Sequence, residues 1–520
     1  MNENISLFMA RRGHIPALSV TAAALRLAAS LAFSAALLTG CAVGPDFRRP
    51  VPPDAKGYTD TSIAPETASA PGAGGDAQRF ISGRDIPSQW WTLFQSKSLD
   101  NLIRQALADS PTLAASQAAL RQAQENWRAQ LGELFPSVDA NFSANRSKFT
   151  GASFGQPNVP GGVFTLYNAS VSVSYTLDLF GGTRRSLEEL QAKVDYQHYL
   201  LEASYLTLTS NIVTTAVQEA SLRAQIRSTK QILKAEEEQL ALVEQQFQLG
   251  GASRADVLAQ KAQLAQTRTT LPPLEKLLSQ TRHLLAVLAG RPPGDAATLP
   301  EFEITDLQLL RELPVSLPSV LVRQRPDILA SEEQLHSACA LIGVATANLF
   351  PKLTITGNYG SQSTLIGDLF SSGTNIWSIG AGLVQPIFRA GELTAKRRAA
   401  IAAYDQANAQ YRETVLQAFQ NVADVLRALE KDAETLKAQS DAEAAARESL
   451  AMAWDQYELG AVSYLVLLNA ERQHQQTRIA LAQTQASRFA DTAALFQALG
   501  GGWWNRDVGE NGKINTSKKE

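Results

Sequence analysis

Four short segments of the chain alternate between apolar and polar residues. In segment 168–177 the odd positions carry Ala, Val, Val, Tyr and Leu, and the even positions carry Asn, Ser, Ser, Ser and Thr. A period of two over about ten residues is typical of a transmembrane β-strand, which meets lipid on one face and water on the other. We expect strands at about 137–146, 164–177, 352–360 and 376–385. On periodicity alone, solvent-exposed strands of a soluble sandwich are the alternative.

Two much longer segments, at about 184–249 and 392–459, contain no proline and are rich in Ala, Leu, Gln and Glu. This composition predicts continuous helices, each about 100 Å long at 1.5 Å per residue. Gly250 and Gly460 are expected to end them, and returning helices should follow at about 254–289 and 464–499. Pro272-Pro273 predicts a kink or an end in the first returning helix.

The chain is an internal duplication. Leu249-Gly250-Gly251-Ala252-Ser253, followed by Gln266-Thr267-Arg268, returns 210 residues later as Leu459-Gly460-Ala461-Val462-Ser463, followed by Gln476-Thr477-Arg478. Pro111 and Phe135-Pro136 return as Pro326 and Phe350-Pro351. We expect one structural repeat at 97–290 and a second at 317–500, joined by an equatorial segment at 291–316.

The first 40 residues are predicted to be a lipoprotein signal peptide. A basic region precedes the apolar stretch 27–38, and Leu38-Thr39-Gly40-Cys41 forms a lipobox. Cleavage there would leave Cys41 acylated, and Ala42 in the next position favours sorting to the outer membrane. An ordinary signal peptide with a stray cysteine is the alternative.

The two ends of the mature chain are expected to be extended. Segment 41–96 is predicted to be a lipid-anchored N-terminal segment. Its part 54–79 is rich in Ala, Gly, Pro, Ser and Thr, which predicts an extended linker without a fold of its own. The polar segment 501–520 is expected to be a C-terminal tail. Trp90-Trp91 and Trp503-Trp504 flank the helical segments, which favours packing there over anchoring in a bilayer interface.

Composition excludes several classes of protein. A net charge of −3 and a pI near 6.1 provide no basic surface for nucleic acid. Two cysteines and five scattered histidines give no disulfide framework, no metal-ligand spacing and no sign of a cofactor. Segment 151–155 spells Gly-Ala-Ser-Phe-Gly, but it lies in a predicted loop without acid and base partners, so no catalytic residue is assigned and an enzyme is not expected.

Four strands cannot close a barrel, and an open strand edge is not tolerated in lipid. The chain is therefore expected to oligomerise. Two copies would give about 8 strands, filled by their own side chains, whereas three would give about 12 and could leave a lumen. Each strand pair leads into a long helical hairpin, so such an oligomer could form a duct.

The mature chain also carries short motifs in a fixed order. They are Cys41-Ala42-Val43-Gly44-Pro45-Asp46-Phe47, Leu177-Asp178-Leu179-Phe180-Gly181-Gly182, Arg325-Pro326-Asp327-Ile328, Phe350-Pro351, Gln385-Pro386-Ile387-Phe388, the two Leu-Gly turns and Leu499-Gly500-Gly501-Gly502-Trp503. Together they resemble the TolC-like outer membrane factors, and within them the NodT-type efflux lipoproteins.

The resemblance implies an α+β membrane protein: a homotrimer whose 12-stranded barrel, with four strands per chain, continues into a long α-helical periplasmic tunnel. It implies a gated outer membrane channel of a tripartite efflux system that exports drugs or other toxic small molecules. The implied partners are outer membrane lipid, a periplasmic adaptor and an inner-membrane pump of the resistance-nodulation-division type. A type I protein secretion duct, or a lipid-anchored adaptor or scaffold without a pore, is the alternative.

Two sites follow from the resemblance. The adaptor is expected to dock on the hairpin turns, at Leu249, Gly250, Gly251 and Ser253 and at Leu459, Gly460, Ala461 and Ser463. The periplasmic gate is expected at Leu465 and Arg472, which match the family's leucine and one of its arginines. Asn469 stands where the family often has an aspartate, and Glu458 where some members have a second arginine. We hypothesise that Glu458 pairs with Arg472 across neighbouring helices, with Leu465 as the steric stop and Asp256 as a further acidic element. The exported substrate does not follow from the residues.

Overall fold

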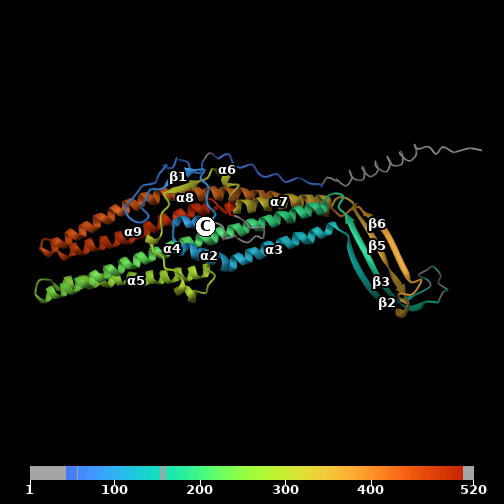
Figure 1. Ribbon diagram of the computed structural model, residues 1–520, viewed down its shortest axis with the longest axis horizontal. Coiled ribbons are helices and arrows are strands. Elements are labelled where there is room, and N and C mark those ends of the chain that lie inside the picture. Colours follow the sequence, from blue (N-terminus) through green and yellow to red (C-terminus); the bar gives the residue numbers. More distant parts are fainter. Residues whose placement is uncertain are drawn as a thin grey trace, which may run out of the picture. The chain divides into compact units, whose positions relative to one another are not determined.

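A computed structural model describes residues 42–55, 57–150, 152, 155, 158 and 160–506 (Figure 1). The predicted signal peptide, Cys41 and the tail from residue 507 lie outside the described residues. The chain divides into two compact units. The first, here called the strand unit, comprises the described residues up to Phe47 together with Trp127–Glu189 and Ala338–Ala403. The second, the helix unit, comprises Arg48–Asn126, Leu190–Ser337 and the described residues from Tyr404 onward.

The strand unit contains a four-stranded antiparallel sheet in the order β2-β3-β5-β6. Its strands are β2 (Ser137–Phe149), β3 (Gly162–Leu177), β5 (Lys352–Ser363) and β6 (Asn375–Val384). The four strands are thus found where the alternation predicted them. The central pair, β3 and β5, joins the strands of the first repeat to those of the second.

The register of the sheet sorts its side chains into an apolar face and a polar face. Directly opposed residues share a face, and one such row crosses all four strands as Ala140, Val171, Tyr359 and Trp377. Another row, one residue along each strand, is Asp139, Ser172, Asn358 and Ser378. The apolar face is exposed within one chain, with Trp377 at 71%. The alternation in sequence therefore produces one face suited to lipid.

The long helices have equal lengths in the two repeats. Helices α4 (Gly182–Gln248) and α8 (Glu392–Glu458) have 67 residues each, and α5 (Arg254–Leu288) and α9 (Tyr464–Ala498) have 35 each. The same offset of 210 residues relates all four pairs of helix ends, as the duplication predicts. Among the described residues, every helix is too short or too polar to cross a bilayer.

Shorter elements complete both units. The helices are η1 (Trp90–Phe94), α2 (Lys97–Asp109), α3 (Pro111–Leu131), η2 (Gly132–Leu134), η4 (Pro293–Thr298), η5 (Ile304–Asp306), α6 (Pro318–Leu321), α7 (Pro326–Ala347), η6 (Ile366–Asp368) and η7 (Trp503–Asn505). The repeated prolines Pro111 and Pro326 are the first residues of α3 and α7. This is the helix position at which proline loses no hydrogen bond.

Helix α5 runs through Pro272-Pro273, so of the two predicted outcomes the helix does not end there, and a kink remains a prediction. Each proline removes the bond to the carbonyl four residues earlier. Those carbonyls belong to Arg268 and Thr269, which are exposed, as are both prolines. Water can therefore satisfy the freed acceptors, and the helix continues.

The prediction that segment 54–79 is an extended linker without a fold is wrong. Strand β1 (Arg79–Ser82) pairs in parallel with β4 (Glu312–Val315), and Gln78 is fully buried. The Gln78 amide donates to Thr492 Oγ1 of α9 at 3.0 Å. This polar segment is held by side-chain hydrogen bonds to helices far away in sequence, which its composition could not reveal.

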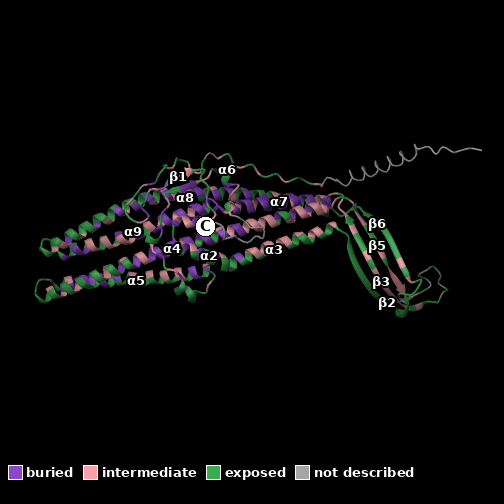
Figure 2. Ribbon diagram, viewed as in Figure 1, coloured by how far each residue is buried: buried purple, intermediate pink, exposed green. Residues whose placement is uncertain are grey.

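The core of the helix unit is built on aromatic residues from both ends of the chain. Trp90 is 1% exposed and stacks on Phe496 with ring centroids 5.3 Å apart, next to Phe94. Trp503 donates from Nε1 to the Gln324 carbonyl at 2.7 Å. The tryptophans therefore pack within the helix unit, as predicted. In Figure 2 buried residues are frequent in the helices around this core and along α7, and the ends of the hairpins are mostly exposed.

Candidate functional site

The two hairpin turns have nearly the same backbone. Gly250 and Gly460 adopt positive φ angles of 77° and 70°, which glycine reaches without strain. In each turn the next residue donates back into the preceding helix: Gly251 to the Gln246 carbonyl and Ala461 to the Gln456 carbonyl, both at 2.8 Å. This is the usual way in which a helix ends at glycine.

The turns present apolar side chains and bare backbone to solvent. Leu249 is 80% exposed and Leu459 is 84% exposed. A Cβ placed on Gly250 or Gly460 would meet nothing within 4 Å. Each turn can therefore be approached closely by another protein, which is the geometry that a docking site needs.

A small apolar core holds the two hairpins together near their turns. Its buried members come from all four long helices: Val243 of α4, Val257 of α5, Ala453 of α8, and Tyr464, Leu467 and Leu468 of α9. Figure 1 shows the α4–α5 and α8–α9 turns at the same end of the helix unit. We call this region the hairpin junction.

The predicted gate residues of α9 share one exposed face. Leu465, Asn469 and Arg472 follow one another at steps of four and three residues, which places them above one another on a helix. All three are exposed in the single chain. Arg472 donates from Nε to Gln263 Oε1 of α5. Glu458 is the last residue of α8 and is exposed. Its pairing with Arg472 remains a prediction.

Asp256 caps the start of α5. Its carboxylate accepts from the Ser253 backbone N–H at 2.9 Å, and the Ser253 hydroxyl accepts from the Asp256 N–H at 3.2 Å. This reciprocal pair is a capping box that begins α5. A part for Asp256 in the gate remains a prediction.

A buried polar cluster lies next to the hairpin junction. Glu236 of α4 is 2% exposed, and its Oε1 accepts from Gln263 at 3.1 Å and from the Thr267 hydroxyl at 2.9 Å. Gln260 donates to the Glu236 backbone carbonyl at 3.1 Å and accepts from the Tyr464 hydroxyl. Glu236 is thus bonded to α5, and Gln260 and Gln263 of α5 in turn bond Tyr464 and Arg472 of α9.

A second carboxylate, Glu471 of α9, belongs to the same cluster. Burial and then repulsion from Glu236 raise the pKa of Glu471 to about 7. Burial also raises the pKa of Glu236, opposed by its bonds from Gln263 and Thr267 and by the charge of Arg472. Both acids are thus harder to ionise than exposed glutamates.

Sequence reasoning missed this cluster, although a signal was present. Glu471 follows Leu467 and Leu468 at helical spacing, so it continues the apolar stripe that forms the junction. Gln260 stands in the same way between Val257 and Leu264, which are both buried. A polar residue within an apolar stripe can be recognised in sequence, but its partner on another helix cannot.

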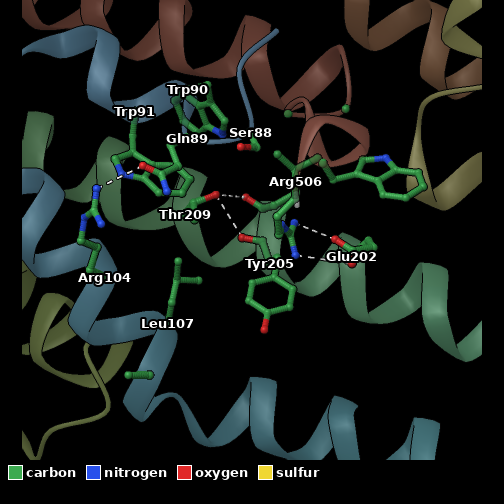
Figure 3. A pocket seen from close by; sticks show the side chains of 15 residues that line it. Ser88, Gln89, Trp90, Trp91, Arg104, Leu107, Glu202, Tyr205, Thr209 and Arg506 are labelled. Carbon is green, nitrogen blue, oxygen red and sulfur yellow. Dashed lines mark hydrogen bonds and ion pairs between the residues drawn. The ribbon is translucent and has the colours of Figure 1, made fainter. Parts of the chain in front are cut away.

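An aromatic pocket of ≈ 240 Å³ lies in the helix unit, between η1, α2, α4 and the C-terminal residues (Figure 3). Trp90, Trp91, Tyr205 and Trp503 line it. Arg506 forms an ion pair with Glu202 at 2.7 Å and lies 4.5 Å from the centre of the Tyr205 ring. This arrangement fastens the last described residue of the chain to α4.

In the strand unit, several of the sequence motifs meet at one place. The Val43 N–H donates to the Phe180 carbonyl at 3.1 Å, and the Phe180 and Phe350 rings stack 4.7 Å apart. Arg185 forms an ion pair with Asp46 at 2.6 Å. A Cβ on Gly181 would lie 2.5 Å from Ala42, so that close approach requires glycine. Residues 42–47 are therefore held in place immediately after Cys41.

The chain matches the model of one protein family, described as outer membrane efflux protein, over residues 102–291 and 317–501. The two matched ranges correspond to the two repeats. The probable efflux pump outer membrane protein TtgC of Pseudomonas putida is 30% identical over 493 residues, which cover 94% of this chain and 99% of that protein. The pyoverdine export outer membrane protein OpmQ of Pseudomonas putida is 31% identical, covering 85% and 94%.

Solved structures agree with the sequence relatives. The outer-membrane channel OprN superposes with a TM-score of 0.79 at 29% identity, covering 89% of this chain and 100% of that one. The relatives are efflux channels of the outer membrane rather than enzymes. These matches confirm the resemblance to the TolC-like outer membrane factors. The chain therefore belongs to the outer membrane efflux protein family and is an efflux channel of the outer membrane.

Proposed function

We propose that three copies of this chain form a gated duct through which an inner-membrane pump of the resistance-nodulation-division type, joined by a periplasmic adaptor, exports small molecules. One observation carries the proposal: a sheet with an apolar face and two open edges is followed, in each repeat, by a long helical hairpin. Among the described residues, the outer strands β2 and β6 are each paired on one side only.

The open edges are the reason for oligomerisation. An unpaired strand edge in lipid leaves backbone groups without hydrogen bonds, at a cost of several kcal/mol for each group. Pairing β6 of one copy with β2 of the next would satisfy both edges. Three copies would close a barrel of about 12 strands, wide enough to leave a lumen.

The hairpin turns suit the adaptor. Leu249 and Leu459 offer apolar anchors next to the exposed backbone of Gly250 and Gly460. The duplication gives each chain two such turns, so a trimer would present six similar sites to an adaptor ring. Ser253 and Ser463, the N-cap residues of α5 and α9, would set the direction of each returning helix.

The lipid anchor at Cys41 would supplement the barrel. Several acyl chains, at about 0.8 kcal/mol per buried CH₂, give effectively permanent attachment. Support comes from the fixed position of residues 42–47 on Arg185, since it would hold Cys41 at a defined place. Mass spectrometry of the N-terminal peptide should find the acyl groups, and Cys41→Ser should abolish them.

The gate is proposed on the exposed face of α9. Leu465 would narrow the lumen, and Arg472, Asn469 and Glu458 would form polar contacts between neighbouring helices. In the open channel this face would turn away from the axis.

Single-channel conductance in a planar bilayer, with native mass measured on the same sample, tests the duct. A trimer with small, mostly closed currents is expected. Leu465→Ala should raise the open fraction, whereas Val466→Ala, also exposed but off the predicted gate face, should not. A monomer, or a trimer that never conducts in either variant, would contradict the proposal.

A further inference from the structure

The two glutamates at the hairpin junction, Glu236 buried and Glu471 half-buried, come from opposite hairpins. Glu236 lies on α4 of the first hairpin and Glu471 on α9 of the second. Both have an oxygen, Oε2, that is buried and has no hydrogen-bond partner among the described residues. Glu236 satisfies only its Oε1, through Gln263 and Thr267. An unpaired carboxylate oxygen in a buried position is costly, because the charge has lost water and gained no donor.

The cluster lacks one positive charge. The cluster has two carboxylates and one guanidinium, that of Arg472, which lowers the pKa of Glu236 and donates to Gln263 rather than to either acid. With both acids ionised, the cluster would have one negative charge in excess. A single proton would remove the excess and turn one carboxylate into a donor.

The remaining charged groups do not supply this neutralisation. The titratable and charged side chains near the pair, apart from Arg472, include Tyr464, with Tyr457 and Asp256 close to it, and Glu238, Arg447 and Asp455 along the groove. The acids and tyrosines in this set add no positive charge. Arg447 lies 3.6 Å from Glu443 on its own helix. Asp256 is occupied in the capping box.

Protons can reach the pair from one side. Glu471 lines a groove between the hairpins, together with Leu242 of α4 and Leu450 and Trp454 of α8. Arg447 and Asp455 on the same groove provide polar access. Glu236 is buried and accepts hydrogen bonds from Gln263 and Thr267.

We propose that Glu236 and Glu471 form a proton-binding site, in which one proton held by the pair keeps the two hairpins of a chain together and its loss drives them apart. Glu471 is the group that releases the proton, because it lies on the groove, and the Gln239 side chain hydrogen-bonds its ionised form. The proton site concerns the folded chain itself. Its consequence, that the periplasmic end opens as the proton leaves, rests on the proposed function.

The direction of the pH effect follows from the raised pKa of Glu471. An exposed glutamate titrates near 4.3, whereas burial and Glu236 move the pKa of Glu471 to about 7. The joined hairpins therefore bind the proton more tightly than separated hairpins do. Between the pKa of an exposed glutamate and the raised pKa of Glu471, each unit of pH increase shifts the equilibrium between joined and separated hairpins toward separation by up to about tenfold. Below this window the junction is fully stabilised, and above it no further change is expected.

The distance between the two turns of one chain provides a direct readout. Spin labels would be attached through Leu249→Cys and Leu459→Cys in a Cys339→Ser background of the full trimer, and the distance measured by pulsed electron resonance. We expect the distance distribution to lengthen as pH rises through about 7. In Glu471→Gln and in Glu236→Gln the short distance should persist at every pH, because an amide stays neutral and donates a bond.

Infrared spectroscopy identifies the proton itself. The carbonyl band of a protonated carboxyl should disappear as pH rises through about 7 and should be missing in Glu471→Gln. Asp491 is a suitable control, because burial and Asp432 also raise its pKa to about 7 although it lies near the other end of α9. Asp491→Asn should remove a second band and leave the pH dependence of the turn distance unchanged.

Three outcomes would overturn the proton site. The first is a turn distance that responds to pH equally in wild type and Glu471→Gln, and the second is a distance that never responds. The third is Ca²⁺ or Mg²⁺ closing the hairpins at high pH with no protonated carboxyl at low pH, which would indicate a metal site instead. A protein that passes these tests but never conducts in a bilayer would keep the proton site and refute the proposed duct.

Discussion

The two copies of the duplicated hairpin carry buried charges of opposite arrangement. In the first copy one acid, Glu219 of α4, is fully buried and meets two arginines, Arg223 at 2.9 Å and Arg282 at 2.6 Å. In the second copy one arginine, Arg488 of α9, is fully buried near two acids, Asp432 and Asp491. Both Arg282 and Arg488 also bind a segment outside the hairpins: Arg282 donates to the Ala296 carbonyl and Arg488 to Thr67 Oγ1.

The two copies therefore have the same backbone but different functional side chains at equivalent positions. At the positions of Leu465, Asn469 and Arg472, the first copy has Ala255, Ala259 and Ala262. Where the second copy has the half-buried Glu471, the first has Lys261, which pairs with Glu244 at 2.7 Å on the surface. The proposed gate and the releasing acid of the proton site therefore belong to the second copy.

The largest effect should come from the arginines of these charge clusters. Arg488→Ala leaves the half-buried Asp432 and Asp491 without their buried counter-charge and frees the N-terminal segment, so we expect a loss of about 3–5 kcal/mol in the free energy of unfolding. Arg282→Ala leaves Glu219 with Arg223 and should cost about 1.5–3 kcal/mol. Chemical denaturation of the purified protein would measure both. Equal losses would mean that the two clusters are equivalent.

The apolar contacts of the hairpin junction should come next. Leu467 of the second copy is fully buried, and Leu467→Ala should cost about 2–5 kcal/mol through lost contacts and a cavity. Its counterpart in the first copy, Val257, loses fewer methyl groups, so Val257→Ala should cost less, at about 0.8 kcal/mol per buried CH₂ group. If Val257→Ala proved the worse of the two by the same denaturation assay, the second copy would not dominate the junction.

The second copy should also make stability depend on pH. Burial and the neighbouring Asp432 raise the pKa of Asp491 to about 7, whereas an unfolded aspartate titrates near 3.9. Because the folded state holds the proton more tightly, stability should decrease as pH rises between these values. Melting temperatures across this range should fall more steeply for wild type than for Asp491→Asn. The first copy has Thr281 at this position, so no matching effect is expected there.

The smallest effect should come from the helix starts. Ser253→Ala removes a capping box and should cost about 0.5–2 kcal/mol. Ser463 begins α9 without a side-chain cap bond, so Ser463→Ala should change stability less. Hydrogen exchange of the first turns of α5 and α9 would compare them. Faster exchange at α9 than at α5 in the respective variants would contradict the assignment.

Much of the architecture could be predicted because it follows a period. Strands β2, β3, β5 and β6 were found from alternation, and the long helices from proline-free segments bounded by Gly250 and Gly460. The continuation of α5 through Pro272-Pro273 could not be predicted, because it depends on whether the freed carbonyls reach water. Segment 54–79 was misjudged because its order comes from Arg488 and Thr492, more than four hundred residues away.

The sequence by itself determined the period of each element, the duplication and the family, because these depend on neighbouring residues and on their order. Only the tertiary structure decided which polar residues are buried together. Glu236 and Glu471 are both ordinary helix residues in sequence, and they become a coupled pair only because the two hairpins pack and exclude water between them. The burial of a side chain and its neighbours depend on tertiary packing, and together they determine the charge that each acid carries.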